Sequence, residues 1–301
     1  MQFKGKNILL TGATGFIGSH VTHLLVEHGY HVTALTSGIT PPHRLSNIRH
    51  KLAWLSLADY PSLPAALSKA GSIEGIISTA VSYGRTGESQ TDLLRANVIQ
   101  PLELIEHFAD HGLEVFINAD TFYPPTRDSY SLSKRQLSDW LPTIACTKRI
   151  AIVNLALQHA YGINDGVKKF IPSIIRACLR NDEGIDLTRG EQTRDFVFAS
   201  DVAEAFLAAL QSPRLEKGKC IQTEIGSGNA ISLRQAVELI KTRTNSSTKL
   251  RFGALEYAPH EIMHACANLQ SARALGWAPR TSLDEGMVRT IAWHREQKEQ
   301  Q

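Results

Sequence analysis

Short apolar runs alternate with longer stretches of helical period along the first half of the chain. The runs predict strands at residues 7–10, 31–35, 52–55, 75–79, 115–118 and 150–155. Apolar residues repeat at helical spacing in two stretches near 91–111 and 129–145. We expect the apolar residues of these two stretches to lie in the hydrophobic core: Leu93, Leu94, Leu104, Ile105, Leu137 and Trp140. Strands that alternate with helices predict an α/β fold with a doubly wound parallel sheet.

The first predicted strand runs directly into a glycine turn, Gly12-Ala13-Thr14-Gly15-Phe16-Ile17-Gly18, and then into a helix expected from Ser19 to Glu27. Gly12 permits a sharp turn, Gly15 lets backbone N–H groups approach a pyrophosphate, and Gly18 lets the helix lie close to the sheet. The motif predicts dinucleotide binding. A purely structural glycine turn is the alternative, since such turns are common after strands.

The end of the second predicted strand indicates which dinucleotide is favoured. An acidic residue there would bind the ribose 2′-hydroxyl of NAD and repel the 2′-phosphate of NADP. The chain instead has Thr36-Ser37-Gly38, followed by His43, Arg44 and Arg49. We therefore expect NADP(H), with NAD(H) as the alternative. The cations also fit a solvated loop with no ligand.

A second motif, Tyr130-Ser131-Leu132-Ser133-Lys134, places a phenol and an ammonium one helical turn apart. A neighbouring ammonium favours phenolate and lowers the pKa of a phenol from about 10. Tyr130 can then exchange a proton with a carbonyl or alcohol oxygen while hydride moves to or from a nicotinamide. Alone the pattern is frequent by chance, but together with the glycine turn it favours redox catalysis.

The composition fits a cytoplasmic enzyme. The chain has 301 residues, 43% of them apolar, enough for one large core and a smaller lobe. A net charge of +3 without a long basic run predicts no nucleic-acid partner, and no stretch is long enough for a membrane span. Cys146, Cys178, Cys220 and Cys266 are widely spaced, as expected for free thiols. The His260-Glu261-Ile262-Met263-His264 run matches a zinc motif, but it follows Pro259 in an expected loop, so we predict no metal.

These motifs, with Asn97-Val98, the Thr193–Phe198 block, Asp201-Val202 and Leu275–Pro279, give the chain a resemblance to the extended short-chain dehydrogenase/reductase family from about Lys6 to Met287. The resemblance implies a Rossmann-type NAD(P)-binding domain at 1–161 and 193–211, and a nucleotide-sugar-binding lobe at 162–192 and 212–301. It also implies a homodimer formed through the two long helices, and a nucleotide-sugar substrate.

The resemblance assigns cofactor contacts to Gly12, Thr14, Gly15, Phe16, Ile17, Gly18, Thr36, Arg44, Ser56, Leu57, Ala80, Asn97 and Lys134. It assigns substrate contacts to Tyr83, Arg127, Gln158, Lys169, Phe170, Arg194, Arg251 and His260. Arg194 is expected to bind the nucleotide diphosphate. The alternative for Arg194 is a surface ion pair with Asp195.

The chain departs from the family at the third catalytic group. Relatives carry Ser or Thr where this chain has Ala119, so Thr121, or else Asp120, is expected to hydrogen-bond the reacting oxygen beside Tyr130 and Lys134. The remaining alternative is that the site works with Tyr130 alone. Family dehydratases carry a catalytic Glu where this chain has Thr121, which argues against dehydration.

The chain is most similar to the 4-ketoreductases that make CDP-abequose and related deoxysugars. The resemblance therefore implies NADPH-dependent reduction of a CDP- or dTDP-linked 4-keto-deoxyhexose. The alternatives are a nucleotide-sugar 4-epimerase with tightly bound NAD and a non-catalytic dinucleotide-binding protein.

Overall fold

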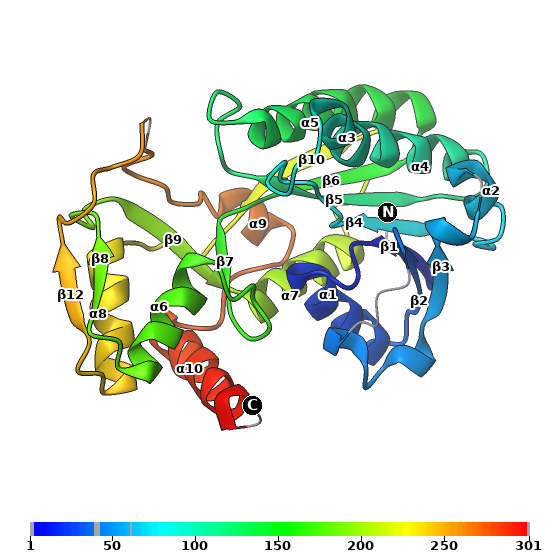
Figure 1. The fold of residues 1–301 in the computed structure, drawn as a ribbon. Helices are drawn as coiled ribbons and strands as arrows, with labels where there is room; N and C mark the ends of the chain where they lie inside the picture. Colours follow the sequence, from blue (N-terminus) through cyan, green and yellow to red (C-terminus); the bar gives the residue numbers. More distant parts are fainter. Residues whose placement is uncertain (1–2, 39–42, 61, 260, 300–301) are drawn as a thin grey trace. The chain divides into compact units, whose positions relative to one another are not determined.

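A computed structural model describes residues 3–38, 43–60, 62–259 and 261–299, and the chain folds into two compact units (Figure 1). The first unit contains Met1–Leu157, Ala203–Glu224 and Gln270–Trp277. The second contains Gln158–Val202, Ile225–Leu269 and Ala278–Gln301. These boundaries differ from those of the predicted domains, since residues 212–224 and 270–277 belong to the first unit, while 158–161 and 193–202 belong to the second.

The first unit is built on a sheet whose strand order is β10-β6-β5-β4-β1-β2-β3 among the described residues. The strands are β1 (Asn7–Thr11), β2 (His31–Thr36), β3 (Ala53–Ser56), β4 (Gly75–Ser78), β5 (Val115–Thr121), β6 (Ala151–Leu157) and β10 (Cys220–Ile225). Every pairing from β3 across to β6 is parallel. The predicted Rossmann-type sheet is therefore confirmed, and its order reverses between β1 and β4, where such sheets bind ligands.

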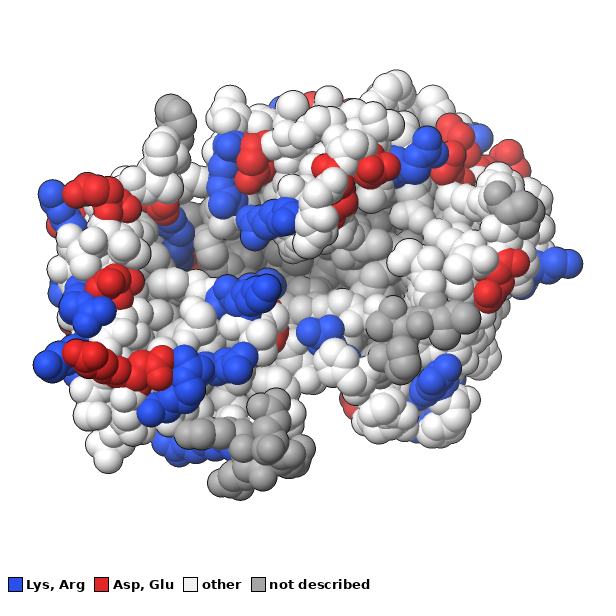
Figure 2. All heavy atoms as spheres, in the orientation of Figure 1, with Lys and Arg blue, Asp and Glu red and all other residues white. Residues whose placement is uncertain are grey.

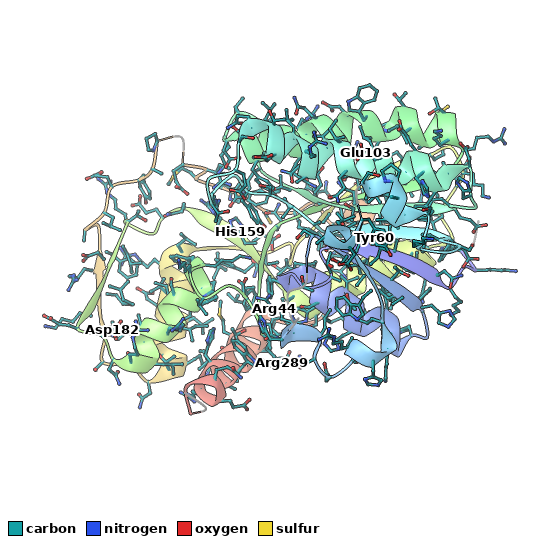
Figure 3. The ribbon with its side chains drawn as sticks, turned by 45° about the vertical axis from the view of Figure 1, so that its right-hand side comes forward. Arg44, Tyr60, Glu103, His159, Asp182 and Arg289 are labelled. Atoms are coloured by element: carbon teal, nitrogen blue, oxygen red, sulfur yellow. The ribbon has the colours of Figure 1, made fainter. Side chains whose placement is uncertain are left out.

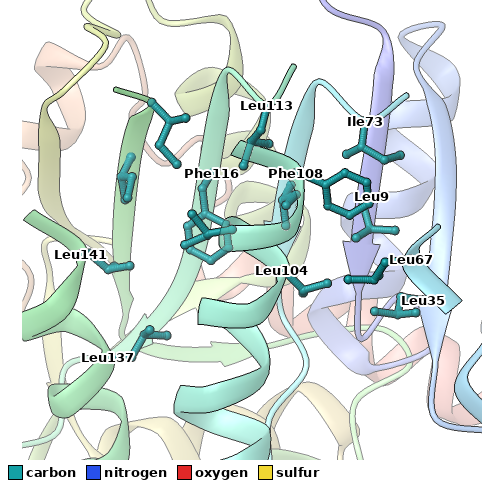
Figure 4. Close-up of a cluster of buried hydrophobic side chains, with 14 of the residues drawn as sticks. Leu9, Leu35, Leu67, Ile73, Leu104, Phe108, Leu113, Phe116, Leu137 and Leu141 are labelled. Carbon is teal, nitrogen blue, oxygen red and sulfur yellow. The ribbon is translucent and has the colours of Figure 1, made fainter. Parts of the chain in front are cut away.

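The helices of the first unit pack on the sheet through continuous apolar faces. They are α1 (Phe16–Glu27), α2 (Leu63–Leu67), α3 (Gln90–Leu94), the π-helical segment η4 (Arg95–Ile99), α4 (Gln100–Ala109), α5 (Ser129–Lys148), α7 (Ala199–Gln211, begun in the second unit) and α9 (Gln270–Ala274). Short 3-10 turns are η1 (His43–Leu45), η2 (Arg49–Lys51) and η3 (Leu57–Asp59). Figure 4 shows side chains of α4 and α5, among them Leu104, Phe108 and Leu141, packed over Leu9 and Phe116 of the sheet.

Two residues predicted to be core lie outside it. Trp140 is 54% exposed and Leu94 is 40% exposed, so the core prediction was wrong for both. The buried face of α5 follows Leu137 and Leu141, one turn apart, and Trp140 lies beside that stripe rather than on it. The other four predicted core residues, Leu93, Leu104, Ile105 and Leu137, are buried.

The second unit has smaller sheets and its own core. Strands β7 (His159–Tyr161), β9 (Thr193–Phe198) and β11 (Ala230–Ser232) form one sheet, and β8 (Gly184–Leu187) pairs in parallel with β12 (Lys249–Phe252). The helices are α6 (Phe170–Arg180), α8 (Leu233–Thr244) and α10 (Leu283–Glu299). Their apolar faces meet through Ile175, Ile240 and Met287. That this unit binds a nucleotide sugar stays a prediction.

Three further features concern the cysteines, the possibility of membrane-spanning helices and the distribution of surface charge. None of the four cysteines, all of which lie in the described residues, forms a disulfide. None of the described helices combines the length and apolar character that a membrane crossing needs. On the face drawn in Figure 2, basic and acidic side chains of the described residues lie next to one another in small groups, which fits ion pairs such as Arg251–Asp186 and Arg180–Asp182.

Candidate active site

The glycine turn after β1 leaves no room for side chains. Gly12 has φ +71°, and a Cβ there would lie 2.5 Å from the backbone N of Ala80. A Cβ on Gly18 would collide with the carbonyl oxygen of Gly12, and one on Gly15 would lie 3.0 Å from the same oxygen. The three glycines therefore let the start of α1 press against the turn and the segment after β4.

The start of α1 suits an anion. The helix begins at Phe16, earlier than the predicted Ser19, with Gly15 as N-cap and no side-chain cap. No acidic side chain lies in its first turn, which contains Phe16, Ile17 and Gly18. Backbone N–H groups and the helix dipole favour a phosphate at such an end. The turn thus fits the pyrophosphate of a dinucleotide, as the sequence predicted.

Polar side chains mark the same edge of the sheet at β2 and β3. Thr36 ends β2 and lies in register with Ser56, which ends β3 just before Leu57 opens η3. The Ser56 hydroxyl is buried and finds no hydrogen-bond partner in the described part of the chain. Because a buried hydroxyl without a partner is costly, Ser56 is suited to a ligand at this edge.

Arg44, labelled in Figure 3, is tied to the glycine turn by its guanidinium. Its Nη1 donates to the carbonyl oxygen of Thr14 at 3.0 Å. Its own carbonyl oxygen lies 3.0 Å from Nε2 of His23 on α1. Arg44 therefore holds a cation beside the predicted cofactor turn, and its contact with a cofactor stays a prediction.

Tyr130 lies in the first turn of α5, which Asp128 caps by accepting from the backbone N of Ser131 at 2.7 Å. Its ring lies 4.8 Å from the ring of Tyr83, measured between centroids. Burial, the first cause, raises the pKa of Tyr130 well above its usual value, and Tyr83 adds to this effect, whereas a hydrogen bond between the Thr121 side chain and the phenol opposes it. The expectation that Lys134 lowers the pKa of Tyr130 was therefore wrong for this structure, because burial outweighs the neighbouring ammonium. The phenol is protonated at neutral pH, as a proton donor must be.

Lys134 lies one turn further along α5 and is almost completely buried. Burial lowers the pKa of its ammonium, and the negative charge of Asp120 acts in the opposite direction. Thr121 N donates to Oδ1 of Asp120 at 2.7 Å, and Asn154 Nδ2 donates to its Oδ2 at 2.6 Å. The structure therefore brings Thr121 to Tyr130 and turns Asp120 toward Asn154 and the charge of Lys134.

Asn97 joins two segments around the site. Its Nδ2 donates to Ser82 O at 2.8 Å and to Ser133 Oγ at 2.9 Å, and its Oδ1 accepts from Ser82 N at 2.8 Å. It lies in the π-helical segment η4, a kind of distortion that is frequent at functional sites. Asn97 thus fixes the loop after β4 relative to α5. Its predicted contact with cofactor stays a prediction.

Two more predicted residues of the first unit lie on segments next to Tyr130. Ala80 donates its backbone N to Thr11 Oγ1 at 3.2 Å, which holds the chain after β4 against β1. Arg127 stacks on the ring of Tyr123, 3.5 Å from its centroid. The predicted contacts of Ala80 with cofactor and of Arg127 with substrate stay predictions.

Arg194, in the second unit, is buried on β9 and is held by the segment before His264. Its Nη2 pairs with Glu261, and its Nη1 donates to Ile262 O at 2.5 Å. The alternative of a surface pair with Asp195 was wrong, because Asp195 is fully buried and accepts from the backbone N of Ser227 and Ala267. Any anion bound at Arg194 has to compete with Glu261.

The other predicted substrate residues lie apart on different elements of the second unit. Gln158 is buried before β7, and its Oε1 has no hydrogen-bond partner among the described residues. Lys169 pairs with Asp165 at 2.9 Å and is the N-cap residue of α6, without a side-chain cap, directly before Phe170. Arg251 pairs with Asp186 at 2.5 Å. His260 lies outside the described residues. The described residues contain no His, Cys, Asp or Glu group that could hold a metal ion. His264 Nδ1 instead lies 2.7 Å from Thr193 Oγ1.

Sequence reasoning missed the residues behind Lys134. Asn118 and Asn154 lie opposite each other on β5 and β6, and Ser138 faces them from α5. One signal was present: asparagine interrupts two otherwise apolar predicted strands. A buried amide needs partners, so such an interruption indicates a polar network.

A parallel sheet that reverses its order beside a glycine turn, with a tyrosine and a lysine near the same edge, is the arrangement of NAD(P)-dependent α/β enzymes. Residues 8–226 match the model of the NAD dependent epimerase/dehydratase family. The chain belongs to this family and is an enzyme of the NAD(P)-dependent class.

Relatives and solved structures agree with this assignment. The chain is 32% identical to CDP-abequose synthase of Salmonella typhimurium over 95% of this chain and 98% of that protein. It is 30% identical to CDP-abequose synthase of Salmonella muenchen over 95% of this chain and 97% of that protein. The UDP-glucose 4-epimerase of Thermotoga maritima has the same fold, with a TM-score of 0.83 at 22% identity over 97% of this chain and 99% of that one.

Proposed function

We propose that this protein is an NADPH-dependent 4-ketoreductase that reduces a CDP- or dTDP-linked 4-keto-deoxyhexose to the 4-hydroxy sugar. The observation that carries the proposal is the site around Tyr130, where a protonated phenol meets the Thr121 hydroxyl one helical turn from Lys134. The two CDP-abequose synthases, similar over nearly the full length of the chain, support a deoxysugar nucleotide as substrate.

The proposed chemistry assigns each residue one task. When NADPH is bound, the hydride that reduces the carbonyl carbon would come from its nicotinamide. Tyr130 donates its phenolic proton to the carbonyl oxygen, which becomes the new hydroxyl. Thr121 donates a hydrogen bond at the same place, in the role that relatives give to a Ser or Thr where this chain has Ala119. Lys134 stabilises the phenolate that remains and hydrogen-bonds the ribose of the bound cofactor.

NADPH is favoured over NADH by the residues at the end of β2. Thr36 carries no charge that would repel a 2′-phosphate, and Arg44 offers a cation beside the glycine turn. Arginine is the residue best matched to phosphate geometry. A reductase that works in one direction also has a chemical reason to use NADPH, because its hydride leaves with the product.

A 4-epimerase with tightly bound NAD is the second candidate. The observation in its favour is the set of solved structures of similar fold, which includes a UDP-glucose 4-epimerase and a UDP-N-acetylglucosamine 4-epimerase. An epimerase returns the hydride to its substrate, so it needs no added cofactor. Dehydration has weaker support, since Thr121 stands where family dehydratases carry a catalytic Glu.

We also propose a homodimer formed through α5 and the α3–η4 region. These elements pack together and expose Leu94, Ile99, Leu132 and Trp140. Apolar residues gathered on neighbouring helices are typical of a contact between protein chains.

The test is the loss of NADPH absorbance when the purified protein meets CDP-, dTDP-, GDP- and UDP-linked 4-keto-6-deoxy sugars, with and without the 3-hydroxyl. Consumption of NADPH with one CDP- or dTDP-linked substrate is the expected result. Turnover of a 4-hydroxy sugar nucleotide without added cofactor would favour the epimerase. NADPH binding without turnover of any substrate would favour the non-catalytic alternative.

A further inference from the structure

A buried polar network connects three elements of the first unit behind Lys134. Asn118 Nδ2 on β5 donates to Asn154 Oδ1 on β6 at 2.7 Å. Asn154 Nδ2 donates in turn to Asp120 Oδ2 at 2.6 Å and to Ser138 Oγ on α5 at 3.0 Å. Asn118 and Asn154 are at most 2% exposed, so water does not compete for these bonds.

The network fixes the direction of one carboxylate. Both hydrogens of the Asn154 amide are used, one of them by Asp120, and the other oxygen of Asp120 accepts from the backbone N of Thr121. A buried amide whose own oxygen is also satisfied has one favourable orientation. Asp120 therefore cannot turn away without leaving Asn154 unsatisfied.

The carboxylate is fixed next to one face of α5. Tyr130, Lys134 and Ser138 follow each other at intervals of four residues and so share this face. Ser138 is bound to the network, and Asp120 acts electrostatically on both Lys134 and Tyr130. Tyr83 and Tyr123 also raise the pKa of Tyr130, in the same direction as Asp120.

We propose that Asp120, aimed by Asn154, is a positioning residue that keeps Lys134 as an ammonium ion and Tyr130 as a protonated phenol. The inference deepens the proposed reductase function and rests on it for its catalytic meaning. It replaces the expected alternative in which Asp120 hydrogen-bonds the reacting oxygen.

The Asp120 carboxylate favours the protonated forms of both Lys134 and Tyr130, which are the forms that reduction requires. A negative charge near a buried lysine favours its charged form, because it compensates for lost hydration. The same charge opposes the phenolate of Tyr130 and therefore favours the proton donor. Removal of the charge should make both groups lose their protons at lower pH.

The first experiment is an NMR titration of the ¹³Cε signal of Lys134, assigned with the Lys134→Arg variant. In Asp120→Asn we expect the titration midpoint to fall by on the order of 1 pH unit relative to the unchanged protein. In Asp120→Glu, which keeps the charge, the Lys134 midpoint should return most of the way to its value in the unchanged protein. Asp110→Asn is the matched control, since Asp110 is 77% exposed and pairs only distantly with Lys148. A midpoint unchanged or raised in folded Asp120→Asn would overturn the proposal.

Asn154→Ala provides an independent test that keeps the carboxylate but releases it. We expect a smaller fall in the Lys134 midpoint, and an unchanged midpoint would count against the aiming role of Asn154. If Asp120→Asn does not fold, the Lys134 midpoint in Asn154→Ala still decides whether the aimed carboxylate of Asp120 acts on Lys134.

The pH profile of NADPH oxidation links the titration to catalysis. In Asp120→Asn the alkaline limb of kcat should move to lower pH, while the KM for NADPH changes little. An alkaline limb at the same pH as in the unchanged protein would contradict the link. If the unchanged protein oxidises no NADPH with any substrate, the proposed function fails, and the NMR titration still decides the electrostatic role of Asp120.

Discussion

The ring of Tyr83 lies against the ring of Tyr130 with 4.8 Å between their centroids and 44° between their planes. Tyr83 comes from the segment after β4, whose position Asn97 fixes through Ser82. The contact shields the phenol from water on one side, and Tyr83 itself is 44% exposed. An aromatic side chain in this position can stack on a sugar ring while it keeps the proton donor dry.

Replacement of Tyr130 by Phe removes the proton donor and little else. We expect kcat for NADPH oxidation to fall by about 10²–10⁴-fold, the usual contribution of a general acid. NADPH affinity, measured by fluorescence, should change less than about threefold. Tyr30→Phe is the control, because the Tyr30 hydroxyl contacts Gln211 in the first unit and no residue of the site. Normal turnover in Tyr130→Phe would exclude Tyr130 as the acid.

Loss of Arg44 should weaken NADPH binding selectively. In Arg44→Ala we expect the Kd for NADPH to rise by about tenfold, the effect of one lost phosphate contact of about 1.4 kcal/mol. The Kd for NADH should stay within about twofold, since NADH lacks the 2′-phosphate. Isothermal titration calorimetry measures both constants. Arg180→Ala is the control, because Arg180 is exposed at the end of α6 in the second unit and pairs with Asp182. Equal losses of affinity for NADPH and NADH would indicate that Arg44 only supports the glycine turn.

The central sheet was predictable because its strands are short apolar runs set between helices. Six of its strands were found in this way, but β10 was not. Its residues, Cys220–Ile225, include the polar Gln222 and Glu224, so the strand lacks a continuous apolar run. An edge strand needs only one neighbour and one buried face, and its sequence signal is correspondingly weak.

The site was predictable where geometry depends on local spacing. Tyr130 and Lys134 share a helix face, and the glycines share one turn, so their sequence pattern fixes their relation. Glu261 and Arg194 are 67 positions apart, and no local pattern indicates that they meet. Their contact depends on how the segment before His264 runs along β9, which only tertiary packing decides.

The glycine turn gives a prediction about both stability and binding. In Gly18→Ala the new methyl group would collide with the carbonyl oxygen of Gly12, which is backbone and cannot move freely. We expect a loss of about 1–3 kcal/mol in the free energy of unfolding, as for overpacked sites. NADPH binding should fall together with stability, because α1 would be pushed off the turn. Chemical denaturation and fluorescence titration measure the two effects.

Gly166→Ala is the matched control for that variant. The nearest atom to a Cβ at Gly166 is Cγ of Lys169, 3.8 Å away, which is ordinary contact. Its unfolding free energy should therefore change by less than about 0.5 kcal/mol. If Gly18→Ala were as stable as Gly166→Ala and bound NADPH normally, the close approach of α1 to the turn would not be needed.

The exposed apolar side chains of α5 lead to a prediction about assembly. Trp140 is among the large apolar residues of the described chain that lie open to solvent, together with Leu132 on the same helix. If a second copy covers them, Trp140→Glu places a charge in an apolar contact, and a buried unpaired charge is strongly unfavourable. Light scattering after size exclusion should then show a shift from dimer to monomer. Val288→Glu, at an exposed apolar residue of α10, should leave the dimer intact. A Trp140→Glu protein that stays dimeric, or an unchanged protein that is already monomeric, would rule out this face as the dimer contact.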